Sequence, residues 1–171
     1  MKDRLLLFSI SVLLFTTSGC HESKQLEQGK VPNQTEDSAR EEKAILRTLN
    51  NETKAAFERD YEAWKDYWIH DPDISKVYLD FAESTFSESV GWEEISGFVA
   101  EFIEQHPDPE PVPDLLDDIE VRLYGNGAWV TYQQKDSVRG LKRETRLMEK
   151  VNGEWKIAGM QTTIYGFDTD N

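Results

Sequence analysis

Residues 143–165, RETRLMEKVNGEWKIAGMQTTIY, decide the fold of this chain. Asn152-Gly153 stands near the middle of the stretch, and this dipeptide is a strong signal for a tight hairpin turn. Apolar and polar residues alternate on both sides of it, which predicts one strand over 143–151 and another over 154–165. The stretch therefore predicts a long antiparallel hairpin.

Further strands precede this hairpin. Alternating apolar and charged residues from Asp118 onward predict a strand, and Gly125-Asn126-Gly127 predicts the tight turn into another strand over 128–134. Together with the hairpin, these strands form an antiparallel meander. A weaker alternation within 75–90 predicts two short strands with a turn near Glu83-Ser84.

Two segments have helical periodicity instead. Residues 40–68 carry an apolar stripe that includes Trp64 and Trp68, with a break near Asp60, and residues 92–105 carry their apolar side chains at i, i+3, i+4, i+7 and i+8. Helices that come before a contiguous meander predict an α+β fold. We expect a curved antiparallel sheet wrapped around the N-terminal helices, as a cone with an interior cavity.

Two short motifs make the chain resemble a known superfamily. Gly91-Trp92-Glu93-Glu94-Ile95 begins the helix over 92–105, and Asn152-Gly153-Glu154-Trp155-Lys156-Ile157 forms the final turn and strand start. With the order of helices and strands over 40–165, they resemble the nuclear transport factor 2-like superfamily, which includes polyketide cyclase-like proteins and ketosteroid isomerase. The resemblance implies the cone fold but no particular activity, because this fold hosts enzymes, binding domains and scaffolds.

The N-terminus has the pattern of a secreted lipoprotein. Lys2 and Arg4 precede the apolar run 5–15, which is too short to span a bilayer as a helix. Cys20, the only cysteine, follows small residues and resembles the lipobox of bacterial lipoproteins, with Thr17 where that family usually has Leu. We expect residues 1–19 to be a signal peptide and Cys20 to carry a lipid. The protein would then be anchored in the cell envelope, facing the periplasm or the exterior.

Composition separates the rest of the chain into a tether and a domain. Residues 20–38 lack apolar periodicity and are expected to be flexible, which leaves 39–171 as one domain. The net charge of −14 disfavours contact with nucleic acid or anionic headgroups. Contact with a membrane is therefore expected only through the lipid on Cys20.

Catalytic and metal-binding motifs are weak. The domain lacks cysteine and the Gly-x-Ser-x-Gly motif of a nucleophilic serine, and no pair of histidines has metal-ligand spacing, so we expect no metal and no cofactor. His70 and Asp71 are the candidates for acid–base chemistry, with Asp66 and Asp80 as further carboxylates. These residues are compatible with an enzyme, but the lack of a recognisable catalytic motif favours a binding domain.

The five Trp and six Tyr residues suggest a pocket for a small, partly apolar ligand, although an ordinary aromatic core would have the same composition. Strict alternation along the last strand would put Gln161 and Thr163 on the same face as Trp155, beneath the helices. Arg146 would need an acidic partner or a ligand if it faced inward. We expect the pocket to be lined by Trp68, His70, Trp92, Trp129, Arg146, Gln161 and Thr163.

The leading hypothesis is a lipid-anchored, non-enzymatic domain that binds a small, partly apolar molecule. The alternative is a small isomerase, dehydratase or cyclase that uses His70 or a nearby Asp as its acid or base. A homodimer through the outer face of the sheet is a further expectation, because proteins that share this resemblance often dimerise there.

Overall fold

The computed structural model describes residues 34–136 and 140–166, so the expected signal peptide, Cys20 and most of the tether lie outside the described residues. The elements are α1 (Gln34–Phe57), α2 (Tyr61–Lys65), β1 (Ser75–Asp80), β2 (Thr85–Val90), α3 (Trp92–Gln105), β3 (Glu120–Tyr124), β4 (Gly127–Asp136), β5 (Gly140–Val151) and β6 (Glu154–Ile164). Within these residues, no helix has the length and apolar character needed to cross a membrane.

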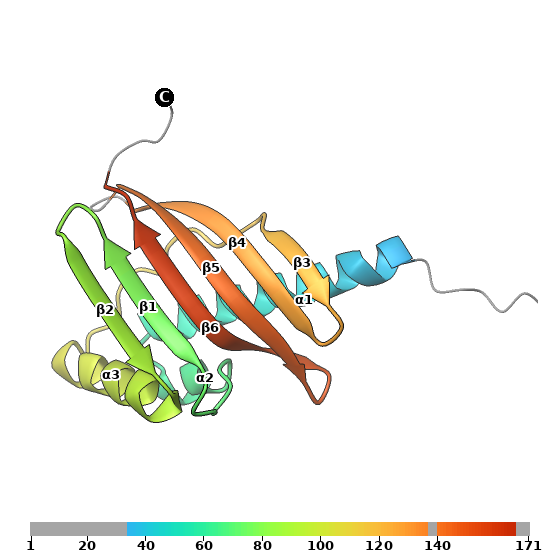
Figure 1. Cartoon of the computed structure of the whole chain (residues 1–171). Coiled ribbons are helices and arrows are strands. Elements are labelled where there is room, and N and C mark those ends of the chain that lie inside the picture. The colour runs from blue at the N-terminus through green and yellow to red at the C-terminus, as the bar shows by residue number, and fades with distance from the viewer. Residues whose placement is uncertain (1–33, 137–139, 167–171) are drawn as a thin grey trace, which may run out of the picture. The chain divides into compact units, whose positions relative to one another are not determined.

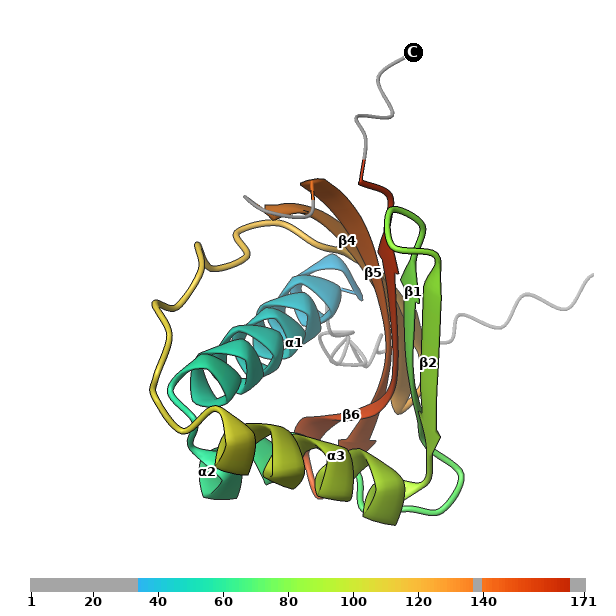
Figure 2. The ribbon, with the colours of Figure 1, turned by 90° about the vertical axis from the view of Figure 1, so that its left-hand side faces the viewer.

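The strands form one curved sheet in the order β2-β1-β6-β5-β4-β3. The meander β3-β4-β5-β6 is antiparallel as predicted, and the β1-β2 hairpin joins it through a parallel pairing of β1 with β6 that the sequence analysis did not predict. Figure 1 shows the sheet with the helices behind it, and Figure 2 shows α1 within the curve of the sheet, with α2 and α3 across one end. The predicted α+β fold is confirmed.

Helix α1 begins earlier than the expected tether allows. Residues 34–38 belong to α1, where Asp37 pairs with Arg40 one turn later, so the tether boundary at residue 38 is wrong. The predicted break near Asp60 is confirmed: Arg59 has a positive φ of 62°, and the Asp60 carboxylate accepts a hydrogen bond from the backbone N–H of Ala63. This side-chain acceptor caps the start of α2.

Helix α3 is positioned by the residue before it. Gly91 has a φ of +81°, and its N–H donates to the carbonyl of Ile74. A Cβ at this position would lie 3.2 Å from the carbonyl oxygen of Pro72, so both the backbone angle and the close approach favour glycine. Trp92 follows directly and donates its N–H to the carbonyl of Asp71. The glycine therefore places Trp92 beside the 70–74 loop.

A β-bulge determines which side chains of β6 face the helices. The register between β5 and β6 shifts at Leu147/Met148, so Ala158 has no partner of its own. One extra residue reverses the alternation of a strand. The side chains on the helix-covered face of β6 are therefore odd-numbered before the bulge and even-numbered after it: Trp155, Ile157, Met160, Thr162 and Ile164.

Candidate functional site

Three rows of side chains cross the concave, helix-covered face of the sheet. Each row takes one residue from β1, β6, β5 and β4 in turn: Lys76–Met160–Arg146–Val130, Tyr78–Thr162–Glu144–Tyr132 and Asp80–Ile164–Lys142–Gln134. All of these side chains are buried or half-buried. Ionised and hydroxyl groups on such a face need partners inside the protein.

Glu144 is the centre of the second row and is well supplied with partners. Thr162 donates its hydroxyl to Oε2 of Glu144 at 2.8 Å, and Nη2 of Arg146 lies 3.4 Å from the same oxygen. Nζ of Lys142 lies 3.6 Å from Oε1. Both carboxylate oxygens are thus engaged by donors from β5 and β6.

Arg146 has fewer hydrogen-bond partners than its guanidinium group can use. Its side chain is almost completely buried, with 5% of the residue exposed, and Nη2 pairs with Glu144. The other two guanidinium nitrogens, Nε and Nη1, are buried and have no hydrogen-bond acceptor among the described residues. Arginine remains charged in proteins, and leaving a buried charged donor unpaired costs more than the roughly 1–3 kcal/mol of a neutral one. The Tyr132 phenol lies near the guanidinium, but it leaves Nε and Nη1 without an acceptor in hydrogen-bonding geometry.

Glu52 brings a carboxylate to this face from α1. It occupies the buried stripe of the helix after Ile45 and Leu49, where an apolar residue would be expected. Oε1 of Glu52 accepts a hydrogen bond from the indole N–H of Trp64 at 2.8 Å and from that of Trp68 at 3.2 Å. The two indoles hold this carboxylate in place.

Lys76 lies at the β1 end of the first row and is 8% exposed. Its ammonium lies 5.3 Å from the ring centroid of Tyr78 and 5.0 Å from that of Phe98, an exposed residue of α3. Burial lowers the pKa of Lys76 to about 8; Glu52 and Glu144 raise it, whereas Arg146 lowers it further. Lys76 is therefore present as both the charged ammonium and the neutral amine near physiological pH.

Tyr132 closes the second row on β4. Burial raises the pKa of its phenol to about 12, although the positive charge of Arg146 acts in the opposite direction. The phenol therefore stays protonated near neutral pH. We call Glu52, Lys76, Tyr132, Glu144, Arg146 and Thr162 the concave polar cluster; its carboxylates already have partners, whereas Arg146 still has donors to satisfy.

The predicted acid–base residues lie elsewhere. His70 is exposed: its ring stacks on Trp92 at 3.8 Å between centroids, and its Nε2 lies 3.0 Å from the carbonyl oxygen of Lys65. Asp71 is also exposed, and its carboxylate accepts the backbone N–H of Asp73. Asp80 does face inward, but its carboxylate holds the β1-β2 turn by accepting two backbone N–H groups. Asp66 is exposed.

Of the seven residues predicted to line the pocket, three lie on the outer face of the sheet and four do not. Trp68 and Trp92 join Trp64 and His70 in an aromatic cluster at the helical end, and Arg146 lies in the concave polar cluster. Trp129, Gln161 and Thr163 lie on the opposite, outer face of the sheet, so placing them in the pocket is wrong. The bulge at Ala158 moves Gln161 and Thr163, and Trp129, with 49% exposure, alternates with buried Ala128 and Val130.

Most residues of the concave polar cluster were not predicted from the sequence. The available signals were a Glu in the apolar stripe of α1 and charged residues at every second position of β5, among them Glu144 and Arg146. Arg146 was predicted for a different reason, because an inward-facing arginine needs an acidic partner or a ligand. Lys76 had no such signal, because the short strand β1 carries buried polar residues on its inner face and half-buried apolar residues on its outer face.

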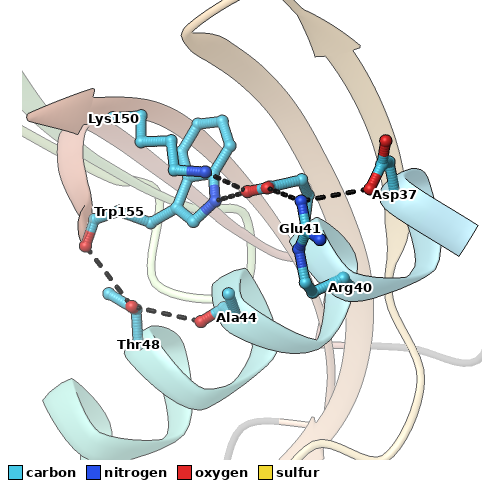
Figure 3. A network of polar contacts seen from close by, with 7 residues as sticks. All are labelled: Asp37, Arg40, Glu41, Ala44, Thr48, Lys150 and Trp155. Carbon is cyan, nitrogen blue, oxygen red and sulfur yellow. Dashed lines mark hydrogen bonds and ion pairs between the residues drawn. The ribbon is translucent and has the colours of Figure 1, made fainter. Parts of the chain in front are cut away.

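A separate network fastens the first half of α1 to the β5-β6 hairpin (Figure 3). The carboxylate of Glu41 accepts hydrogen bonds from Nζ of Lys150 at 2.6 Å and from the indole of Trp155 at 2.8 Å. Thr48, two turns later, donates to the backbone carbonyl of Trp155 at 3.3 Å. The hydrogen bonds of Lys150 and Trp155 lower the pKa of Glu41. This network orients α1, and with it Glu52, over the concave face.

The remaining features of the described residues are a surface hollow and the arrangement of potential metal ligands. A hollow of about 310 Å³ lies between the start of α1 and β3, lined by Ser38, Glu42, Val121, Arg122 and Leu123. No group of three or more His, Cys, Asp or Glu side chains in the described ranges is placed to hold a metal ion. The interior cavity of the cone stays a prediction.

Comparisons with known proteins identify the fold. No protein-family model and no curated protein matches the chain. A nuclear transport factor 2-like protein of unknown function from Pseudomonas putida is 16% identical with a TM-score of 0.56, over 77% of this chain and 91% of that one. A similar protein from Shewanella oneidensis is 19% identical, TM-score 0.52, over 71% and 97%. A superfamily protein from Salmonella enterica is 16% identical, TM-score 0.54, over 74% and 92%.

Proposed function

We propose that this chain, which has the nuclear transport factor 2-like fold, binds a small, partly apolar molecule with one acidic group against its concave face. The observation that carries the proposal is Arg146, whose Nε and Nη1 are buried without an acceptor in the part of the chain that the structure describes. The acidic group of the ligand would accept from these nitrogens. Val130 and Met160, the neighbours of Arg146 in the first row, would contact its apolar part.

An acidic group fits this place better than a basic one. The inward-facing carboxylates already accept hydrogen bonds: Glu52 from two indoles, Asp80 from two backbone N–H groups and Glu144 from Thr162. Arg146, in contrast, has donors that an acidic ligand would satisfy. Hydrogen bonds between guanidinium and carboxylate are about twice as strong as neutral ones, and they strengthen further where water is excluded. The ligand would enter between α3 and β1, where Lys76 retains some exposure beside Phe98.

The test compares acids with their neutral analogues. Thermal unfolding of the protein is measured with 3-phenylpropanoate, cyclohexanecarboxylate and the corresponding amides. The acids should raise the melting temperature, with about 2.7 kcal/mol of stabilisation at a hundredfold excess over Kd, and the amides should do much less. Arg146→Met should remove the difference, while Arg143→Met, on the outer face of the same strand, should keep it. Equal shifts from acids and amides would contradict the proposal.

The location is proposed from the N-terminal sequence. The basic leader, the apolar run 5–15 and Cys20 support export, cleavage after Gly19 and a lipid on Cys20, so the binding face would work outside the cytoplasm. Cell fractionation tests this together with metabolic labelling by a radioactive fatty acid. The parent protein should be labelled and membrane-bound, and Cys20→Ser should be unlabelled. An unlabelled, full-length parent in the cytoplasm would contradict the anchoring proposal.

The positions of His70 and Asp71 do not support the hypothesis of an enzyme that uses either residue as acid or base. Both residues are exposed, and neither belongs to the concave polar cluster. Lys76 does belong to the cluster, and burial lowers its pKa to about 8.

A further inference from the structure

We propose that Lys76 forms a reversible imine with a carbonyl group of the bound molecule, so that the ligand class is small oxo acids with an apolar part. This inference rests on the proposed binding of an acid at Arg146. It assigns a second contact and a covalent step to the same concave face.

The position of Lys76 relative to Arg146 is the first argument. Both residues pair with Met160, Lys76 from β1 and Arg146 from β5, so they flank β6 in the same row and point to the same face. Adjacent strands lie about 4.8 Å apart, so the two Cα atoms are separated by roughly 10 Å. Their long side chains can therefore reach two functional groups of one small molecule.

The contacts of Lys76 are the second argument. Among the described residues, no carboxylate forms an ion pair with its ammonium, whose near neighbours are the rings of Tyr78 and Phe98. A structural lysine on a covered face would be expected to pair with an acid, and Glu52 and Glu144 are instead held by other donors. The amine of Lys76 is thus not held in an ion pair with a described carboxylate, and 8% of the residue remains exposed.

The surrounding charges are the third argument. The groups that act on Lys76 from the neighbouring elements are Glu52 on α1 and Glu144 and Arg146 on β5. Burial and Arg146 favour the neutral amine, whose lone pair is needed for attack, and a pKa of about 8 leaves roughly a quarter of it neutral at pH 7.5. An exposed lysine with an ordinary pKa is neutral only about one time in a thousand.

The chemistry balances without a cofactor. The lone pair of Nζ attacks the carbonyl carbon and forms the C–N bond, while the carbonyl oxygen takes up a proton as the amine loses one. The resulting carbinolamine loses its hydroxyl group and the remaining N–H proton as water, which leaves the C=N bond. Amine and carbonyl are thus converted into imine and water, with no net oxidation or reduction. The protonated imine would keep the positive charge that Glu52 and Glu144 favour.

The experiment traps this imine in the full-length protein. The protein is incubated with 2-oxo-4-phenylbutanoate and sodium cyanoborohydride at pH 7.5, and the alkylated lysines are located by peptide mass spectrometry. Lys76 should be modified at least about tenfold faster than Lys65, whose pKa is raised by its hydrogen bond with Glu62. The rate at Lys76 should rise with pH and level off above about 8.

Matched variants separate this inference from the proposed binding. Lys76→Arg should remove the fast modification, Lys142→Arg in the third row should keep it, and Arg146→Met should slow it at least tenfold by removing the acid contact. If 3-phenylpropanoate binds as proposed but Lys76 is modified no faster than Lys65, the imine is refuted and the binding function stands. If neither acid binds and modification is uniform, both proposals are wrong.

Discussion

The two faces of the sheet differ in how far they are covered: charged residues are buried on the concave face, whereas large apolar residues are exposed on the outer face. On the concave face, Lys76, Glu144 and Arg146 are buried beneath the helices and must find partners there. On the outer face, large apolar side chains such as Trp129, Leu147 and Phe86 stay exposed, since none of the described helices covers them (Figure 1). A charged side chain on the concave face is therefore costly unless it is paired, whereas one on the outer face can be solvated.

A single residue separates the two faces along β6. Without the bulge at Ala158, Gln161 and Thr163 would share a face with Trp155 and Ile157, and Thr162 could not donate to Glu144. With the bulge, Met160 and Thr162 enter the first two rows of the concave face. The predictions below contrast substitutions on the two faces, from the largest expected effect to the smallest.

The largest effect is expected at Arg146. Arg146→Ala leaves the buried Glu144 without one of its cationic partners, so the free energy of unfolding should fall by about 3–5 kcal/mol. Arg143→Ala removes an exposed arginine three residues earlier on the outer face and should cost at most about 1 kcal/mol. Urea unfolding of both variants measures the contrast. Equal losses would mean that the two faces do not differ as described.

Lys76 should make stability depend on pH. Its pKa is about 8 in the folded protein against an ordinary value of 10.5, so between these values the unfolded chain binds a proton that the folded protein has released. The parent should therefore gain up to about 3 kcal/mol relative to Lys76→Met as the pH rises from 7.5 to 10.5. Urea unfolding of both proteins across this range provides the data. A constant difference would show that the folded pKa of Lys76 is ordinary.

Substitution of Glu41, at the edge of the concave face, should have a smaller effect on the free energy of unfolding. Glu41→Gln weakens the hydrogen bonds from Lys150 and Trp155, and we expect a loss of about 1–2 kcal/mol at pH 7. Because the folded pKa of Glu41 lies below 4.5, this stabilisation is complete well above pH 4.5 and disappears as the pH falls through the folded pKa. Thermal unfolding of parent and variant at pH 7, 5 and 3 should show the difference shrink with acidity.

Substitution of Gln161 should have the smallest effect on the free energy of unfolding. It is exposed on the outer face, and its side chain contacts Thr163 with a long hydrogen bond of 3.4 Å. Gln161→Ala should change the free energy of unfolding by less than about 0.5 kcal/mol and leave the affinity for carboxylates unchanged. Calorimetric titration with 3-phenylpropanoate checks both the variant and the parent. Weaker binding by the variant would place the ligand on the outer face.

The elements of the fold could be predicted from the sequence because their signals are local. The turn at Asn152-Gly153 and the apolar period of 92–105 specify strands and a helix from neighbouring residues alone. The parallel pairing of β1 with β6 joins segments about 80 residues apart, and no local pattern specifies it. The predicted pocket was partly wrong for a related reason: strict alternation was applied across Ala158, and a bulge there depends on the partner strand.

The most direct test of the account is a crystal structure of the protein with 3-phenylpropanoate bound. The account predicts a carboxylate oxygen within about 3 Å of Nε or Nη1 of Arg146, with the phenyl ring against the first row of the concave face. A carboxylate bound on the outer face near Trp129, with Nε and Nη1 of Arg146 satisfied by groups of the protein itself, would contradict it.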